Sequence, residues 1–174
     1  MTLQRIANRI ALLKANTPVQ AGLITFTTGA LFSAFEAQKS GFTDRSAHPR
    51  RWQAELNDAR LAAADMAKGR RPSRTTWVCI VHFNSALIRI DVGFERLVRH
   101  VTGSNSRNME TLVKAAKSKR LPGKALRQWQ RVRCQEVNKL KHRNPSSLVR
   151  YRMKYAEMIK ALDDLVSLLT FILK

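Results

Sequence analysis

The chain has 174 residues, the length of one domain or of a small domain with an extension. Its hydrophobic fraction of 44% is enough for a buried core and excludes a wholly disordered chain. The 32 lysines and arginines exceed the 12 acidic residues and give a net charge of +20, which predicts a polyanionic partner. Nucleic acid comes first as that partner, ahead of an acidic protein or an anionic membrane.

Helical spacing of apolar side chains predicts three helices in the first part of the chain, over residues 1–16, 18–38 and 49–68. The apolar segment 19–37 follows basic residues as a signal peptide would, but it contains Glu36 and no small-residue cleavage site, so we expect a buried helix. Its residues expected to face a core are Leu23, Phe26, Ala30 and Phe35. A basic, glycine- and proline-containing linker follows, and we assign residues 1–70 to an N-terminal helical region.

Four further helices are predicted, over residues 74–101, 108–119, 123–143 and 147–173. The last has eight apolar residues at strict heptad spacing from Leu148 to Ile172, which is typical of bundle packing or a helical dimer seam. Trp129 is expected in the core. We assign residues 71–174 to a helical bundle. The predicted fold is therefore an all-α antiparallel helical bundle with an N-terminal helical extension.

Several polar residues interrupt the apolar pattern. Asn84 and Asp91 lie seven apart on one apolar line, either as satisfied core hydrogen-bonding groups or beside a functional cleft. Cys79 and Cys134 have no metal-ligand spacing and are expected to be buried thiols of a cytoplasmic protein. No segment reads as a membrane span, and neither a metal nor a cofactor is expected.

The positive charge is concentrated in residues 107–154, which hold 15 of the 32 basic residues but only 2 of the 12 acidic ones. Helical spacing beside the apolar anchors sets four of these cations in a row, Lys124, Arg127, Arg131 and Lys139, and such a row can track a phosphate backbone. Aromatic residues are sparse among them, which favours recognition of backbone and shape over base reading. The residues expected to bind nucleic acid are Lys117, Lys119, Arg120, Lys124, Arg127, Arg131, Arg133, Lys139, Lys141 and Arg143, with Arg70, Arg71 and Arg74 around the linker.

A histidine and an asparagine stand together in the segment EVNKLKHRN, residues 136–144. Asn138 and His142 are four apart and therefore share a helix face. An imidazole has a pKa near neutrality, as a general acid or base requires, and a nearby cation would be needed for developing phosphate charge. We take Asn138 and His142 as the candidate catalytic pair, or else as polar residues on a surface that holds nucleic acid.

Residues 76–172 resemble the HEPN superfamily of prokaryotic helical domains. The resemblance lies in the order of elements, a long helix, a short helix, the break RLPGK, a helix ending in VNKLKHRN and a long amphipathic helix. Family members carry an arginine, a polar residue that is often asparagine, three variable residues and a histidine. Asn138 and His142 match that pattern, and Val137 stands where the arginine belongs. The resemblance implies a metal-independent ribonuclease site assembled across a dimer, in a setting such as antiviral defence.

The departure at Val137 favours RNA binding with a degenerate ribonuclease site, RNA being preferred over DNA. One alternative is a structural subunit of a ribonucleoprotein, like the small helical subunits of CRISPR effector complexes that line a strand. An active HEPN ribonuclease and a module that binds an acidic protein are the others. The expected assemblies are a homodimer or a larger ribonucleoprotein, with no membrane partner.

Overall fold

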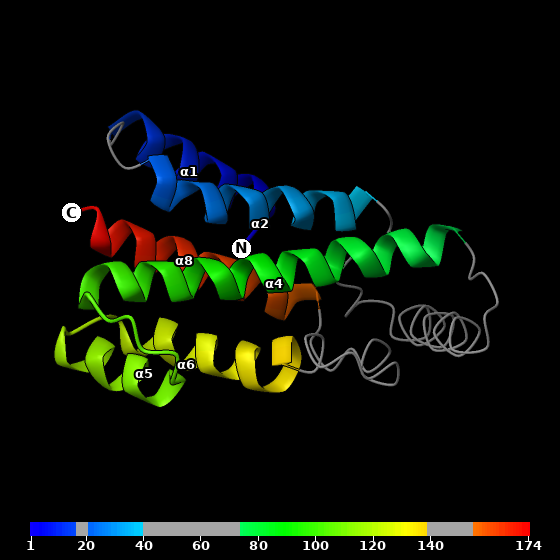
Figure 1. Cartoon of the computed structure of the whole chain (residues 1–174). Coiled ribbons are helices and arrows are strands. Elements are labelled where there is room, and N and C mark those ends of the chain that lie inside the picture. Colours follow the sequence, from blue (N-terminus) through cyan, green and yellow to red (C-terminus); the bar gives the residue numbers. More distant parts are fainter. Residues whose placement is uncertain (17–20, 40–73, 139–154) are drawn as a thin grey trace.

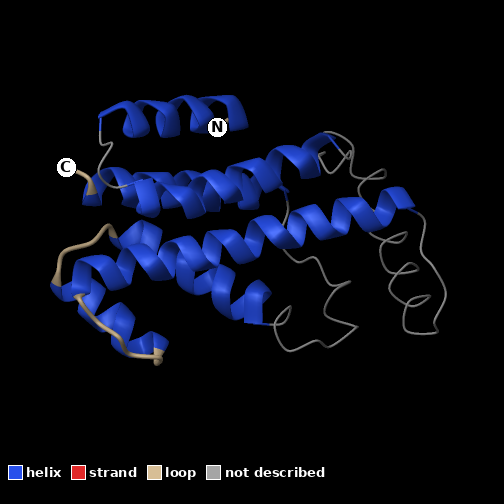
Figure 2. Ribbon diagram, turned by 45° about the horizontal axis from the view of Figure 1, so that its top comes forward, coloured by secondary structure: helices blue, strands red, loops and turns tan. Residues whose placement is uncertain are grey.

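The protein is all-helical throughout the part that this computed structural model describes, residues 1–16, 21–39, 74–138 and 155–174. Its helices are α1 (Leu3–Asn16), α2 (Ala21–Lys39), α4 (Arg74–Thr102), α5 (Met109–Ser118), α6 (Gly123–Val132) and α8 (Tyr155–Ile172), and a π-helical turn, η2 (Arg133–Val137), continues α6. Figure 1 shows α4 and α8 at the centre, with α1 and α2 on one side and α5 and α6 on the other. The predicted all-α bundle is confirmed, and Figure 2 shows only helices and connecting loops in the described part.

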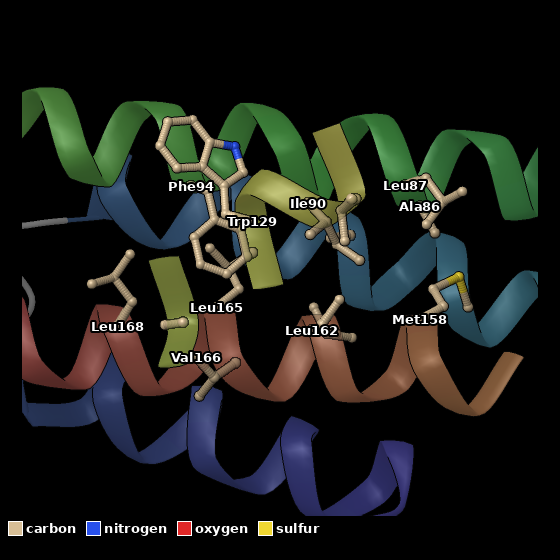
Figure 3. Close-up of a cluster of buried hydrophobic side chains, with 14 of the residues drawn as sticks. Ala86, Leu87, Ile90, Phe94, Trp129, Met158, Leu162, Leu165, Val166 and Leu168 are labelled. Carbon is tan, nitrogen blue, oxygen red and sulfur yellow. The ribbon is translucent and has the colours of Figure 1, made fainter. Parts of the chain in front are cut away.

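One hydrophobic core joins all six helices. Its largest fully buried side chains include Trp129, as expected, together with Phe83 and Phe94. The stacked rings of Phe94 and Trp129 have centroids 6.2 Å apart and join α4 to α6, next to Leu165 of α8 (Figure 3). Aromatic pairs of this kind bury large apolar areas. Because α1 and α2 contribute to this same cluster, the helices on both sides of the boundary expected at residue 70 share a core.

Helix α2 packs antiparallel against α4, and Ser33 Oγ lies 3.3 Å from Ser85 Oγ across the contact. Helix α2 carries small residues where it meets α4, with Gly29 beside Arg89 and Ser33 beside Ser85, and Ala30, Ala34 and Ala37 of the same helix are fully buried. The expected core face was therefore only partly right, because Ala30 is fully buried whereas Phe26 is half-buried at the edge. A close approach of two helix backbones leaves no room for a large aromatic ring in the middle of the contact.

The other predicted helices agree with the structure where it describes them. The heptad residues from Tyr155 to Leu169 are buried along α8, which confirms bundle packing for that part of the seam. The helix expected over 123–143 is α-helical from Gly123 to Val132 and then passes into η2, and residues 139–143 lie outside the described part. Residues 49–68 and the start of the last predicted helix lie outside the described residues. No helix in the described ranges is long and apolar enough to cross a membrane.

Candidate nucleic-acid interface

The turn between α5 and α6 is held by a Schellman arrangement. The Leu121 amide donates to the Ala116 carbonyl at 3.2 Å, and the Arg120 amide donates to the Lys117 carbonyl at 3.0 Å. The buried Leu121 anchors the turn in the core. The first residue beyond the cap must adopt a positive φ, a position usually filled by glycine, and here Arg120 has φ 56°. The chain thus tolerates about 1 kcal/mol of backbone strain to place an exposed arginine at this turn.

Six exposed cations surround this turn. We call them the α5–α6 cation cluster: Lys114, Lys117, Lys119, Arg120, Lys124 and Arg127. Five of the six were predicted to bind nucleic acid, and Lys114 is an addition. Within the described part of the chain, none of them forms a salt bridge with an acidic side chain. Their cationic groups are therefore available to an external anion such as a phosphate backbone.

Two other predicted residues, Arg131 and Arg133, are paired with acidic side chains of neighbouring helices. Arg131 Nη2 lies 3.0 Å from Glu157 Oε1 of α8. Arg133 Nη1 donates a hydrogen bond to Glu95 and lies 3.5 Å from Asp91 Oδ1, so that η2 is tied to α4. A guanidinium group that already pairs with protein carboxylates is less available to a phosphate, which separates these two arginines from the cluster.

Arg133 belongs to a buried polar network between α4 and α6. Asp91 is fully buried and accepts a hydrogen bond of 3.0 Å from Trp129 Nε1, and the guanidinium of Arg133 lies over the Trp129 ring. Glu95 also accepts hydrogen bonds from Arg99. Burial acts to raise the pKa of Glu95, but the hydrogen bonds from Arg133 and Arg99 outweigh it and hold that pKa below its ordinary value. Asp91 is therefore a core group with satisfied hydrogen bonding, as the first interpretation expected, whereas the buried Oδ1 atom of Asn84 has no hydrogen-bond partner among the described residues.

The candidate catalytic pair is only partly described. Asn138 follows η2 and is half-buried, and Val137, at the position of the family arginine, is fully buried. Asn138 thus follows a π-helical turn, and such turns occur frequently at functional sites.

Among the basic residues predicted around the linker, Arg74 is the first residue of α4. The remaining predicted site residues lie outside the described part of the chain: His142, Lys139, Lys141, Arg143, Arg70 and Arg71.

Three exposed groups were not predicted from the sequence. Arg89 and Arg96 are exposed on α4, outside the segments where cations are dense, although their spacing of seven already places them on one face. The expectation of a buried thiol was wrong for Cys134, which is free and exposed. Cys134 follows the exposed Arg127 by seven residues, close to two helical turns, so it lies toward the same outward side.

Two adjacent aspartates on α8 have opposite environments. Asp163 forms an ion pair with Arg9 of α1. Asp164 is buried, and its Oδ2 atom has no hydrogen-bond partner among the described residues. Burial raises the pKa of Asp164, against the attraction of Lys160 and Lys124. The charged form of Asp164 is therefore a cost to the fold, whereas that of Asp163 is stabilising.

Asp164→Asn is expected to raise the free energy of unfolding at pH 7 by about 1 kcal/mol, because the buried carboxylate loses its charge. Asp163→Asn is expected to lower the free energy of unfolding, since the ion pair with Arg9 is lost. An acid whose folded-state pKa is raised destabilises the fold increasingly as pH rises from its unfolded-state pKa through its folded-state pKa. The gain in the free energy of unfolding from Asp164→Asn should therefore be smaller near pH 4 than at pH 7. Thermal melts at the two pH values measure this difference. A lower melting temperature for Asp164→Asn at pH 7 would contradict this assignment.

Comparison of the chain with models of known protein families, with curated protein sequences and with solved structures gave no match. Across the described ranges, no group of three or more histidine, cysteine, aspartate and glutamate side chains could hold a metal ion. The described surface around the turn between α5 and α6 offers exposed guanidinium and ammonium groups.

Proposed function

We propose that this protein binds nucleic acid, RNA in preference to DNA, through the α5–α6 cation cluster and in the cytoplasm. The observation that carries the proposal is that six exposed cations surround one turn without an acidic partner in the described chain. Each phosphate that such a cation neutralises releases a condensed counterion and so adds affinity. The buried Trp129 offers no ring for base stacking, which favours contact with the backbone over contact with bases. The preference for RNA rests on the HEPN resemblance.

We further propose that the ribonuclease site is degenerate. A group that stabilises developing phosphate charge must be free to approach the phosphate. Val137 has no such group, and Arg133, one turn before it, is engaged by Glu95. Holding a strand is therefore favoured over cutting it, in a homodimer or as a structural subunit of a ribonucleoprotein.

The salt dependence of binding tests this proposal. We expect the purified protein to bind a labelled single-stranded RNA with an affinity that falls steeply between roughly 50 and 200 mM salt. If all six cations contact phosphates, the slope of log affinity against log salt is about −4, at about −0.7 for each phosphate on a single strand. Binding that is unchanged over this range would rule out phosphate contacts. The same titration in EDTA shows whether RNA is cut, and cleavage that His142→Ala abolishes would establish the ribonuclease alternative.

A further inference from the structure

Two exposed arginines on α4, Arg89 and Arg96, are held in place by helix α2. They lie seven residues apart on one face of α4, which corresponds to about 10 Å along the helix axis. Neither forms a salt bridge with an acidic side chain of the described residues. Both cations are thus exposed and, within the described chain, unneutralised.

The position of Arg89 depends on a glycine of α2. Arg89 Nε donates to Ser85 Oγ at 3.3 Å, and Ser85 in turn contacts Ser33 of α2. The guanidinium lies so close to α2 that a Cβ atom at Gly29 would come within 2.6 Å of Arg89 Nη1. Glycine at position 29 is therefore required for this placement of the guanidinium.

Arg96 is held by an aromatic ring of the same helix. Its Cζ atom lies 5.5 Å from the ring centroid of Phe26, a cation–π contact that holds the guanidinium group over the ring. A guanidinium group in such a contact still presents N–H donors, which suit the paired oxygens of a phosphate. Because both arginines are held before a ligand arrives, less side-chain entropy is lost when one binds.

This arginine pair lies on a different side of α4 from the α5–α6 cation cluster. Arg89 and Arg96 contact α2, whereas Asp91 and Glu95 face α6 and η2. Figures 1 and 2 both show α2 and α6 on opposite sides of α4. We propose that Arg89 and Arg96 form a second phosphate-backbone site, so that one molecule joins two RNA strands. This inference rests on the proposed function, which supplies the first strand.

A two-strand capture experiment tests the bridge. A homopolymeric single-stranded RNA is immobilised, the protein is bound to it, and capture of a second, labelled RNA is measured. Arg89→Ala/Arg96→Ala is expected to stay on the first strand but to capture about 25-fold less of the second at 0.1 M salt, from the loss of two phosphate contacts. Undiminished capture would overturn the inference, because it would mean that bridging occurs by another route, such as pairing of two protein copies. Wild-type protein that binds the first strand without capturing a second overturns it equally, whereas wild-type protein that binds no RNA overturns both this inference and the proposed function.

Gly29→Ala is a second variant that leaves every charge in place. The added Cβ displaces only the far end of Arg89, so capture should fall about fivefold while the melting temperature is kept or raised by the better helix propensity of alanine. Gly22→Ala on the same helix is the matched control, because a Cβ atom there meets nothing within 4 Å. Equal capture by the two alanine variants would show that the placement of Arg89 does not matter and would overturn its role in the site.

Discussion

Arg120→Gly combined with Arg127→Ala is expected to lower the affinity for single-stranded RNA about 25-fold at 0.1 M salt. Each lost phosphate contact changes log affinity by about 0.7 for a tenfold change in salt, which corresponds to about fivefold at 0.1 M relative to 1 M. Two such contacts multiply to about 25-fold. The slope of log affinity against log salt should become shallower by about 1.4 in the same titration.

The same double variant is expected to be more stable than the native protein. Glycine at position 120 removes the positive-φ strain, a gain of about 1 kcal/mol. Arg127 is exposed and has no salt bridge in the described chain, so its replacement should change stability little. Weaker RNA binding together with a higher melting temperature could not be explained by partial unfolding, which is the usual ambiguity of a charge-removal experiment.

Two exposed cations on α1 provide the matched control. Arg5→Ala/Lys14→Ala removes the same charge from a helix that Figures 1 and 2 show on the far side of the bundle from α5 and α6. We expect this variant to bind RNA within about threefold of the native protein, through loss of net charge alone. If both double variants lose affinity equally, the protein attracts RNA by its overall charge and the cluster is not the binding site.

The exposed thiol of Cys134 offers an independent measurement. It lies on the outward side of η2, two turns beyond Arg127, so bound RNA should slow its alkylation in a Cys79→Ala background. In Arg120→Gly/Arg127→Ala the protection should require a correspondingly higher RNA concentration.

The helices could be predicted because the apolar residues that face the core recur in an amphipathic helix with a period of 3.6 residues. The heptad spacing of α8 and the burial of Trp129 are instances, and both are confirmed where the structure describes them. The core face of α2 was harder to predict, since apolar residues lie on nearly all its sides and Phe32 is even exposed. The small residues of α2 allow it to approach α4 closely and so determine which of its faces is buried. That choice depends on both helices and cannot be predicted from the sequence of α2 alone.

The sequence could not predict which cations are free of protein carboxylates and so available to a phosphate. Arg131 and Arg133 look the same as Arg127 in a count of charges, and all three belong to the same predicted helix. The carboxylates that pair with the first two belong to α8 and α4, far away in the sequence, and only the packing of those helices brings them together. Similarly, the strain at Arg120 depends on how α5 ends, and the break RLPGK marks a turn without showing which residue takes the positive φ.

Arg133→Ala is expected to lower the free energy of unfolding by about 3 kcal/mol, the largest effect we expect on stability from the loss of one charge. The reason is that Asp91, which is fully buried, loses a guanidinium 3.5 Å away, while Glu95 loses a hydrogen bond. Urea denaturation followed by circular dichroism measures the change. The matched control is Arg131→Ala, whose ion pair with Glu157 is more than one-third exposed on both partners, so we expect at most about 0.5 kcal/mol.

A double-mutant cycle and a pH series distinguish the loss of this charge network from a simple loss of packing. Arg133→Met keeps much of the side-chain volume, and adding Asp91→Asn should restore about 1–2 kcal/mol, because the buried charge is then removed with its partner. The pKa of Glu95 is below its ordinary value of 4.5 in the folded state, so this group stabilises the fold above about pH 4.5 and the contribution is lost as pH falls through the folded-state pKa. Without Arg133 the pKa of Glu95 should rise toward its ordinary value, and the loss of stability below pH 4.5 should become shallower. An unchanged acid dependence in Arg133→Met would mean that the arginine acts through packing on Trp129 rather than through its charge.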